Sequence, residues 1–322
     1  MNLVSVILPF YNAEDLLVKT IQSIIGQTYS HIELIMIDDG STDQSQQVAR
    51  SYTHLSNVKL LIQENEGAAV ARNTGLKAAS GIFIQFMDAG DIITADKIQQ
   101  QVEAIRDDMH KVAVCNYVMF SNEADLQSDH FPDQSSFIYT TNETQDFLIN
   151  LWGGYGRRNF IQTNSWLIPR NLIERAGGWR PYRCPDDDGE FFSRILLASS
   201  GIVYTPGVYN YYHTVSAAGV QLSKSKDRKH LMNSLLSIDL KHKYLLAKGK
   251  HPKIKAAIGS QYFRFAVDTY PHQRILSKIA FKRYKSLGHK IEAPLIGGWP
   301  FELIKYVFGW RIARLIRYIL RD

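Results

Sequence analysis

Four short motifs, three of which carry carboxylates and glycine, hold side chains in this 322-residue chain that could do chemistry. In order they are Val4–Asn12 (VSVILPFYN), Ile37–Asp43 (IDDGSTD), Met87–Asp91 (MDAGD) and Asp186–Glu190 (DDDGE). The first three each end a run of apolar residues typical of a buried strand. Open α/β sheets bind ligands at the carboxyl ends of such strands. Carboxylates there are costly unless they meet a cation or a substrate proton, so the clusters predict an enzyme acting on a metal-bound, phosphate-bearing substrate.

The first two clusters suit contact with a nucleotide. Pro9, Tyr11 and Asn12 end the first predicted strand, where Tyr11 could stack on a nucleobase. Asp38 and Asp39 end the second strand, where a carboxylate can accept hydrogen bonds from a base N–H or from ribose hydroxyls. A strand end followed by an ordinary helix cap is the alternative for each cluster. Two adjacent carboxylates exceed what capping needs, which favours ligand contact.

Arg72 lies in a predicted helix of small residues, within the stretch NEGAAVARNTG over residues 65–75. An arginine in such a place either pairs with a carboxylate or contacts a diphosphate. The chain has no P-loop pattern and no G-x-G-x-x-G after a strand. The chain therefore lacks the sequence motifs that usually indicate an ATPase or a Rossmann dehydrogenase.

The remaining acidic clusters indicate metal binding and proton transfer. Asp88 and Asp91 stand three residues apart around Gly90 and can hold one divalent cation and its phosphates. Asp187 and Asp188 are adjacent, and repulsion between neighbouring carboxylates tends to raise the pKa of at least one, as a general base requires. The alternatives are a solvated turn for the first pair and an acidic helix N-terminus for the second.

Alternating strand and helix patterns in the first half predict a mainly parallel sheet built from βαβ units. We expect strands over Leu3–Pro9, Glu33–Asp38, Val58–Gln63, Ile82–Met87, Lys111–Met119, Thr163–Ile168, Ile202–Thr205 and Val208–His213. We expect helices over Glu14–Gln27, Thr42–His54, Ala68–Ala79, Thr94–Arg106, Asn171–Ala176 and Glu190–Ser199. Residues 120–159 are polar and are interpreted as loops near a substrate cleft.

Charge is distributed unevenly along the chain. Residues 1–221 carry 15 Lys and Arg against 25 Asp and Glu, whereas residues 222–322 carry 22 against 6. We therefore predict a catalytic domain over 1–220 and a basic helical region over 221–322. Within the former we distinguish two halves, 1–119 and 120–220.

A basic and amphipathic helix is predicted at the end of the chain, after a break at Gly309. One face holds Arg311, Arg314, Arg317 and Arg321, and the other holds Ile312, Leu315, Ile316, Ile319 and Leu320. This pattern favours contact of residues 299–322 with an anionic membrane surface. Packing on the catalytic body or a dimer contact is the alternative. Nucleic acid is not expected, because no binding fold accompanies the charge.

The bulk composition indicates a cytoplasmic protein. Two cysteines far apart give neither a disulfide framework nor a metal-ligand spacing. The N-terminus lacks a signal peptide, and no apolar run of about 18 residues could span a bilayer. We expect a cytoplasmic location, peripheral on the inner face of the cell membrane where the tail binds it.

The ordered motifs VSVILPFYN, IDDGSTD, NEGAAVARNTGL and MDAGD, followed by an acidic pair and EFFSR, resemble those of the family 2 glycosyltransferases over about residues 3–215. The resemblance implies a GT-A fold and inverting transfer from a nucleotide-diphosphate sugar, with 1–119 as the nucleotide-sugar half and 120–220 as the acceptor half. It places Tyr11, Asp38 and Asp39 at the nucleobase and Arg72 near the nucleotide. It also implies Asp88 at a Mg²⁺ or Mn²⁺ ion.

The same resemblance makes Asp188 the base, with Asp187 as the alternative one residue away. The chain departs from the family's D-x-D metal motif at Gly90, where the third residue should be acidic. The implied activity is transfer from a UDP-sugar to a hydroxyl of a glycan or lipid-linked acceptor in cell-surface polysaccharide synthesis. A nucleotidyltransferase and a non-catalytic nucleotide-sugar binding protein remain as alternatives.

Overall fold

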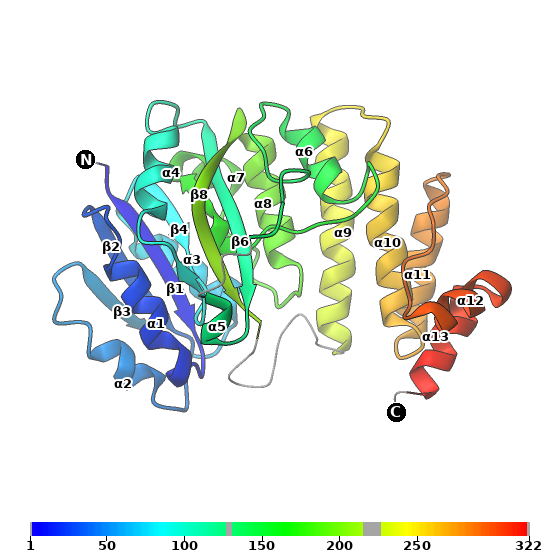
Figure 1. Cartoon of the computed structure of the whole chain (residues 1–322), viewed down its shortest axis with the longest axis horizontal. Helices are drawn as coiled ribbons and strands as arrows, with labels where there is room; N and C mark the ends of the chain where they lie inside the picture. Colours follow the sequence, from blue (N-terminus) through cyan, green and yellow to red (C-terminus); the bar gives the residue numbers. More distant parts are fainter. Residues whose placement is uncertain (1, 127–130, 215–226, 321–322) are drawn as a thin grey trace. The chain divides into compact units, whose positions relative to one another are not determined.

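The computed structural model describes residues 2–126, 131–214 and 227–320 (Figure 1). The chain divides into two compact units. The first comprises Met1–Thr144, Ile161–Arg183 and Asp187–Leu222, and the second comprises Gln145–Phe160, Cys184–Asp186 and Ser223–Asp322. The chain therefore passes from the second unit into the first between Asp186 and Asp187.

A mixed, mainly parallel sheet forms the first unit (Figure 1). Its described strands are β1 (Val4–Phe10), β2 (Ile32–Asp38), β3 (Val58–Ile62), β4 (Phe83–Phe86), β5 (Ile92–Ile93), β6 (Lys111–Phe120), β7 (Trp166–Pro169) and β8 (Gly201–His213). Their order is β3-β2-β1-β4-β7-β6-β8-β5. The first four pair in parallel, β7 runs antiparallel to both of its neighbours, and β8 pairs in parallel with β6.

Strands β1 and β2 are buried at every residue. Continuous apolar runs of this kind are typical of parallel strands that helices cover on both faces. The described helices of the first unit are α1 (Glu14–Ile25), α2 (Ser45–Arg50), α3 (Ala68–Ala78), α4 (Lys97–Ile105), α5 (Glu123–Leu126), α7 (Arg170–Ala176) and α8 (Asp187–Ala198). Helix α3 approaches the sheet closely at Gly75, where an added Cβ would lie 2.4 Å from Ile7 Cγ2.

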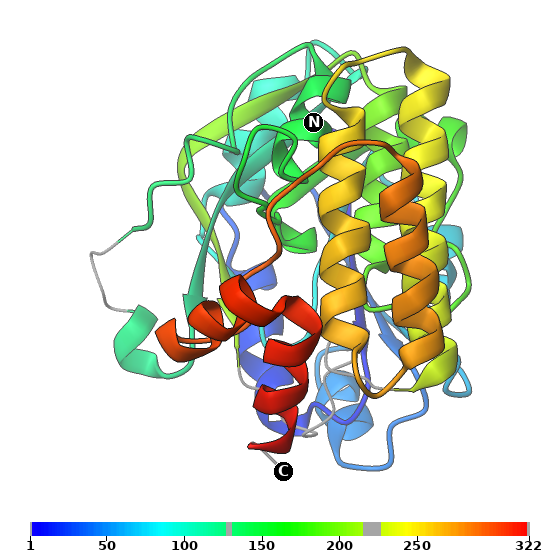
Figure 2. The ribbon, with the colours of Figure 1, turned by 90° about the vertical axis from the view of Figure 1, so that its right-hand side faces the viewer.

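Helices make up the second unit. They are α6 (Thr144–Leu151, whose first residue belongs to the first unit), α9 (Arg228–Lys248), α10 (Ile254–Thr269), α11 (Arg274–Ser286), α12 (Trp299–Phe308) and α13 (Trp310–Ile319). Helices α9, α10 and α11 lie side by side (Figures 1 and 2). Phe263 of α10 stacks on Tyr284 of α11, with ring centroids 4.7 Å apart. Gly309, at φ 83°, separates α12 from α13 as the sequence predicts.

The predicted fold class is confirmed, but several predicted bounds were wrong. Helix α4 begins at Lys97 rather than Thr94, and α8 begins at Asp187 rather than Glu190. Helix α2 begins at Ser45, whose backbone N–H donates to the Asp43 carboxylate at 2.9 Å. The strand expected from Thr163 starts at Trp166, after a short 3-10 turn. The two strands expected on either side of Pro206 form one strand, β8. A register shift at Cys115 leaves the proline in an irregular part of the strand, where its missing N–H is tolerated.

Residues 120–159 contain elements that the sequence does not reveal. Helices α5 and α6 lie there among polar residues without a clear period. The domain halves predicted for the nucleotide sugar and the acceptor stay predictions. Within the described ranges, every helix is too short or too polar to cross a lipid bilayer.

Candidate functional site

Three parallel strands bring their carboxyl ends together at one edge of the sheet. Strand β1 lies between β2 and β4, and Phe10 pairs with Asp38. Asp39 N donates to Phe10 O at 2.9 Å, and Met87 N donates to Ile7 O at 2.9 Å. The clusters after β1, β2 and β4 therefore meet at this edge, as predicted.

The loops after β1 and β2 are tied to each other. Asn12, at φ 47°, accepts a 2.8 Å hydrogen bond from Thr42 N through its side chain, and its own N donates to Ser41 Oγ at 3.1 Å. The two loops hold Tyr11 between them at the strand end, with 46% of its surface exposed. Pro9 is buried within β1. Tyr11 is thus accessible at the strand end, while Pro9 is part of the buried strand.

Asp38 and Asp39 are buried and hold the loops that follow them. Asp38 accepts hydrogen bonds from Ser41 N at 2.8 Å and from the Gln46 side chain at 3.0 Å. Asp39 Oδ2 accepts from Gly67 N at 2.8 Å, directly before α3. Each carboxylate oxygen can accept more than one hydrogen bond, so a nucleobase can still be recognised at this position.

Arg72 of α3 connects two of the acidic clusters. Its Nη2 donates to Asp88 Oδ1 at 2.7 Å, and its Nη1 donates to Asp187 Oδ2 at 3.4 Å. The guanidinium lies 4.4 Å above the Trp179 ring. Burial acts to lower the pKa of Arg72, but the charges of Asp88 and Asp187 outweigh it and raise the pKa. Within the described residues its buried Nε has no hydrogen-bond partner.

Asp88 and Asp91 occupy different environments in the turn after β4. The Asp88 side chain is 34% exposed beside Arg72. Asp91 is 2% exposed, and its carboxylate accepts hydrogen bonds from Asn164 Nδ2 at 2.6 Å and from His213 N at 2.9 Å. Burial raises the pKa of Asp91 well above its usual range, and the charge of Asp88 adds to the rise.

Gly90 gives this turn its backbone conformation. Its φ is 103°, which side-chain-bearing residues rarely adopt. Its N donates to Thr20 Oγ1 at 2.9 Å, and the Thr20 hydroxyl donates to Asp91 O at 2.9 Å. The departure from D-x-D at this position therefore has a structural cause in the left-handed turn.

The three consecutive carboxylates at the start of α8 also separate. Asp186 pairs with Lys241 of α9 inside the second unit. Asp187 contacts Arg72, and its Oδ1 accepts from Asp188 N at 2.9 Å. Asp188 Oδ1 accepts from Gly189 N at 2.7 Å. Asp187 and Asp188 thus belong to the arginine-linked cluster of the first unit.

Three residues beside this cluster are not among the predicted site residues. Trp179 is a buried residue under Arg72 that also stacks on Phe191, with centroids 4.1 Å apart. Asn164 holds Asp91. His213 lies at the end of β8, its Nδ1 3.4 Å from where a Cβ on Gly90 would stand. For His213, its position at the end of a predicted strand was the signal in the sequence that could have placed it near the site.

A divalent cation fits the donor set only with help from a ligand. Among the described residues, no group of three or more His, Cys, Asp and Glu side chains could hold a metal ion. Asp88 offers a partly exposed carboxylate, the kind of oxygen ligand that Mg²⁺ takes together with substrate phosphates and water. A cation bound jointly by Asp88 and a diphosphate is therefore compatible with these residues.

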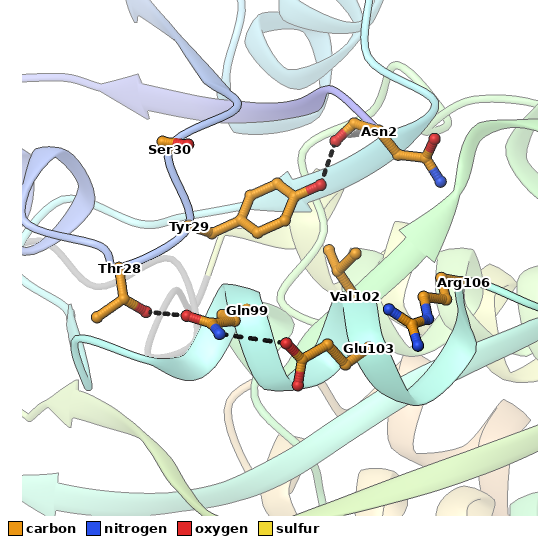
Figure 3. A pocket seen from close by; sticks show the side chains of 8 residues that line it. All are labelled: Asn2, Thr28, Tyr29, Ser30, Gln99, Val102, Glu103 and Arg106. Atoms are coloured by element: carbon orange, nitrogen blue, oxygen red, sulfur yellow. Dashed lines mark hydrogen bonds between the residues drawn. The ribbon is translucent and has the colours of Figure 1, made fainter.

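A surface cavity of about 290 Å³ lies elsewhere in the first unit (Figure 3). Its lining includes Asn2, Tyr29, Gln99 and Glu103, and Tyr29 donates to Asn2 O at 2.5 Å. Asn2 precedes β1, so the cavity is at the amino end of that strand. It is separate from the carboxylate cluster and takes no part in the site.

Comparisons with known proteins agree on one family. The sequence model of glycosyl transferase family 2 matches residues 5–172. Glycosyltransferase GlyA of Streptococcus pneumoniae is 35% identical over 216 residues, which are 62% of this chain and 29% of that protein. The UDP-Glc:alpha-D-GlcNAc-diphosphoundecaprenol beta-1,3-glucosyltransferase WfgD of Escherichia coli is 40% identical over 123 residues, 38% of this chain and 48% of WfgD.

The fold has a counterpart among solved structures. Residues 1–349 of S. aureus TarS, solved in complex with UDP-GlcNAc, superpose with a TM-score of 0.69 at 17% identity, covering 99% of this chain and 91% of that one. At this identity the likeness establishes the fold alone. The chain spans less than half the length of GlyA and of WfgD.

Proposed function

The chain belongs to glycosyl transferase family 2, and from this premise we propose that it is an inverting hexosyltransferase. Its donor is a nucleotide-diphosphate sugar, namely a UDP-sugar, and its acceptor is a hydroxyl of a glycan or lipid-linked glycan in cell-surface polysaccharide synthesis. One observation carries the proposal. Arg72 contacts both Asp88 of the turn after β4 and Asp187 of the acidic pair. The buried guanidinium therefore links the carboxylate proposed to face the diphosphate with the pair proposed to face the acceptor.

Transfer would proceed as a single in-line displacement. Asp188 accepts the proton of the acceptor hydroxyl while that oxygen forms a bond to the anomeric carbon. The bond from this carbon to the diphosphate oxygen breaks on the opposite face, which inverts the configuration and releases the nucleoside diphosphate. Arg72 lies where it can balance charge on the departing phosphates.

Asp88 rather than Asp91 is our choice for the metal-binding carboxylate. Asp88 is accessible, whereas Asp91 is buried and its carboxylate contacts Asn164 and His213 N. When bound, Mg²⁺ or Mn²⁺ supplies a positive charge that stabilises the leaving diphosphate. Asp91 then keeps the turn in place beneath Asp88.

The nucleotide would lie over the ends of β1 and β2. Tyr11 offers an exposed ring for the base, and Asp38 and Asp39 offer carboxylate oxygens beside it. Two similar proteins support this choice of ligands, since TarS was solved with UDP-GlcNAc and WfgD is named for UDP-Glc and a diphosphoundecaprenol-linked acceptor.

Substitution of the proposed base tests the function. Asp188→Asn should lower transfer at least about 1000-fold, because the amide cannot accept the proton, while donor affinity stays within about twofold. Transfer is measured as nucleoside diphosphate released, and donor affinity by calorimetry with Mn²⁺. A screen of UDP-, GDP- and dTDP-sugars by thermal stabilisation identifies the donor first. Near-normal transfer by Asp188→Asn would remove Asp188 from the role.

The same assay separates the two alternative functions. A nucleotidyltransferase would release pyrophosphate from a nucleoside triphosphate, and a non-catalytic binding protein would release nothing. Metal-dependent release of UDP from a UDP-sugar in the presence of an acceptor is expected only from the proposed transferase.

We also propose that residues 299–322 contact an anionic membrane surface at the inner face of the cell membrane. Helix α12 has no buried residue, and Trp299 and Tyr306 are 78% and 89% exposed. Arg311, at the start of α13, is also exposed. Apolar aromatic side chains next to basic ones suit the boundary between headgroups and acyl chains.

A further inference from the structure

One face of α9 holds the residues that precede the acidic pair. Within the second unit, Ser237 Oγ donates to Asp186 Oδ2 at 2.8 Å, and Lys241 Nζ donates to the same oxygen. Cys184 Sγ donates to Ser234 Oγ at 3.9 Å. Ser234, Ser237 and Lys241 are spaced by three and four residues, so they share one face of the helix. We call these three residues the α9 clamp.

Lys241 of the clamp forms an ion pair with Asp186, in which the lysine is buried and the Asp186 side chain is 26% exposed. Lys241 is 1% exposed, and its ammonium lies 5.1 Å from the Trp152 ring centroid. Burial acts to raise the pKa of Asp186, but the charges of Lys241 and Arg158 outweigh it and lower the pKa. Removing Lys241 takes from Asp186 the largest of the interactions that offset its burial. The pair therefore fixes Asp186 in one position.

Asp186 is joined by consecutive peptide bonds to Asp187 and Asp188. Peptide planarity keeps successive Cα atoms 3.8 Å apart, so a shift of Asp186 moves the start of α8 with it. Resting on the proposed role of Asp188 as base, we infer that the α9 clamp positions the acidic pair for proton transfer. Helix α9, which lies outside the residues matched by the family model, is then required for catalysis through Lys241 as a positioning residue.

A purely structural role would give a different result. If the clamp served only stability, its loss would lower the unfolding temperature but leave turnover of the folded enzyme unchanged. A positioning role predicts a fall in kcat at temperatures where the variant is fully folded, since a displacement of about 1 Å can cost about 100-fold in rate. The affinity for the donor should stay unchanged although kcat falls, because the donor contacts other residues.

The test uses Lys241→Met in the full chain. UDP release from UDP-glucose, UDP-galactose and UDP-N-acetylglucosamine is followed with water as acceptor, and the affinity for each is measured by calorimetry. We expect kcat to fall about 100-fold with the dissociation constant unchanged within about twofold. Lys241→Arg keeps the cation and should retain turnover to within about tenfold. Lys243→Met, on the exposed side of the same helix, is the matched control and should behave as wild type.

Each outcome decides the inference. Wild-type turnover in a folded Lys241→Met protein would overturn it. If that variant does not fold, Ser237→Ala decides, since it removes the hydroxyl that donates to Asp186 O and Asp186 Oδ2 and should lower kcat several-fold without altering donor affinity. Unchanged turnover in Ser237→Ala would then refute the clamp. A wild-type protein that binds a UDP-sugar but never releases UDP would refute the proposed function instead.

Discussion

The turn after β4 depends on the backbone of Gly90. An ideal Cβ at this position would lie 3.1 Å from Leu16 Cδ1, and φ is 103°. Gly90→Asp would complete the D-x-D motif. We nevertheless expect it to lower the free energy of unfolding by about 1–3 kcal/mol and to weaken donor binding with Mn²⁺. Urea unfolding and calorimetry measure the two effects.

Gly207 provides the control for Gly90. It also has a positive φ, 78°, but an added Cβ there meets nothing within 4 Å. Gly207→Asp should therefore be strained without any change in donor affinity. Tighter Mn²⁺-dependent binding by Gly90→Asp would contradict the structural explanation and would mean that the chain had lost a metal ligand at this position.

From the sequence, the side chains at the strand ends could be placed together at one edge of the sheet. Their different environments could not be predicted. Spacing after strands correctly gathered Tyr11, Asp38 and Asp88, because the carboxyl ends of adjacent parallel strands meet. Spacing could not distinguish Asp88 from Asp91, because the difference between them is burial beneath β8. Burial depends on residues more than a hundred positions away.

At the scale of secondary structure, one buried lysine joins α4, β4 and the turn before β7. Lys97 Nζ donates to Gln85 Oε1 and to Gln101 Oε1, each at 2.7 Å. The two glutamine amides in turn donate to Asn164 O and Ser165 O, each at 2.9 Å. Asn164 is the residue that holds Asp91, so this network supports the turn of the site from beneath.

The lysine predicts a dependence of stability on pH. Burial lowers the pKa of Lys97 to about 8 from its ordinary 10.5. Between these values the unfolded chain binds more protons than the folded one, so stability rises with pH; below about 8 the full cost of burying the charge remains. From pH 7.5 to 10, wild type should gain about 2 kcal/mol relative to Lys97→Met.

Urea unfolding of both proteins at the two pH values measures this difference. Titration of tyrosines and other lysines affects both proteins alike and cancels in the comparison. An unchanged difference between wild type and Lys97→Met would mean that the Lys97 ammonium has an ordinary pKa in the folded state.

Elements with strong local signals were predictable, and those defined by long-range pairing were not. The apolar runs of β1 and β2 gave their strands to within one residue. The two-residue strand β5 exists only because it pairs with β8, and α6 lies in a polar stretch. Gly309 ends α12 through its positive φ, which a glycine in an apolar helical pattern does suggest.

At the scale of the whole molecule, the basic charge of the C-terminal region has two uses. Part of it serves the second unit itself: Arg314 donates to Val267 O and Tyr270 O at the end of α10, and Arg311 lies 5.1 Å from the Phe281 ring. The predicted arginine face is therefore partly engaged within the unit. What α12 leaves exposed is apolar, with Trp299, Leu303 and Tyr306 at helical spacing on one face.

This apolar face gives the last prediction. A variant with Trp299, Leu303 and Tyr306 each changed to Gln should lose flotation with phosphatidylglycerol vesicles, because the buried apolar area that favours interfacial binding is gone. Since Lys and Arg remain, residual binding should be weak and abolished by salt. Ile62→Gln removes an exposed apolar side chain from β3 of the other unit and should float as wild type does. Equal flotation of the triple variant would exclude α12 as the contact. A wild-type dimer that the triple variant converts to a monomer, without vesicle binding by either protein, would instead assign the face to a second copy of the chain.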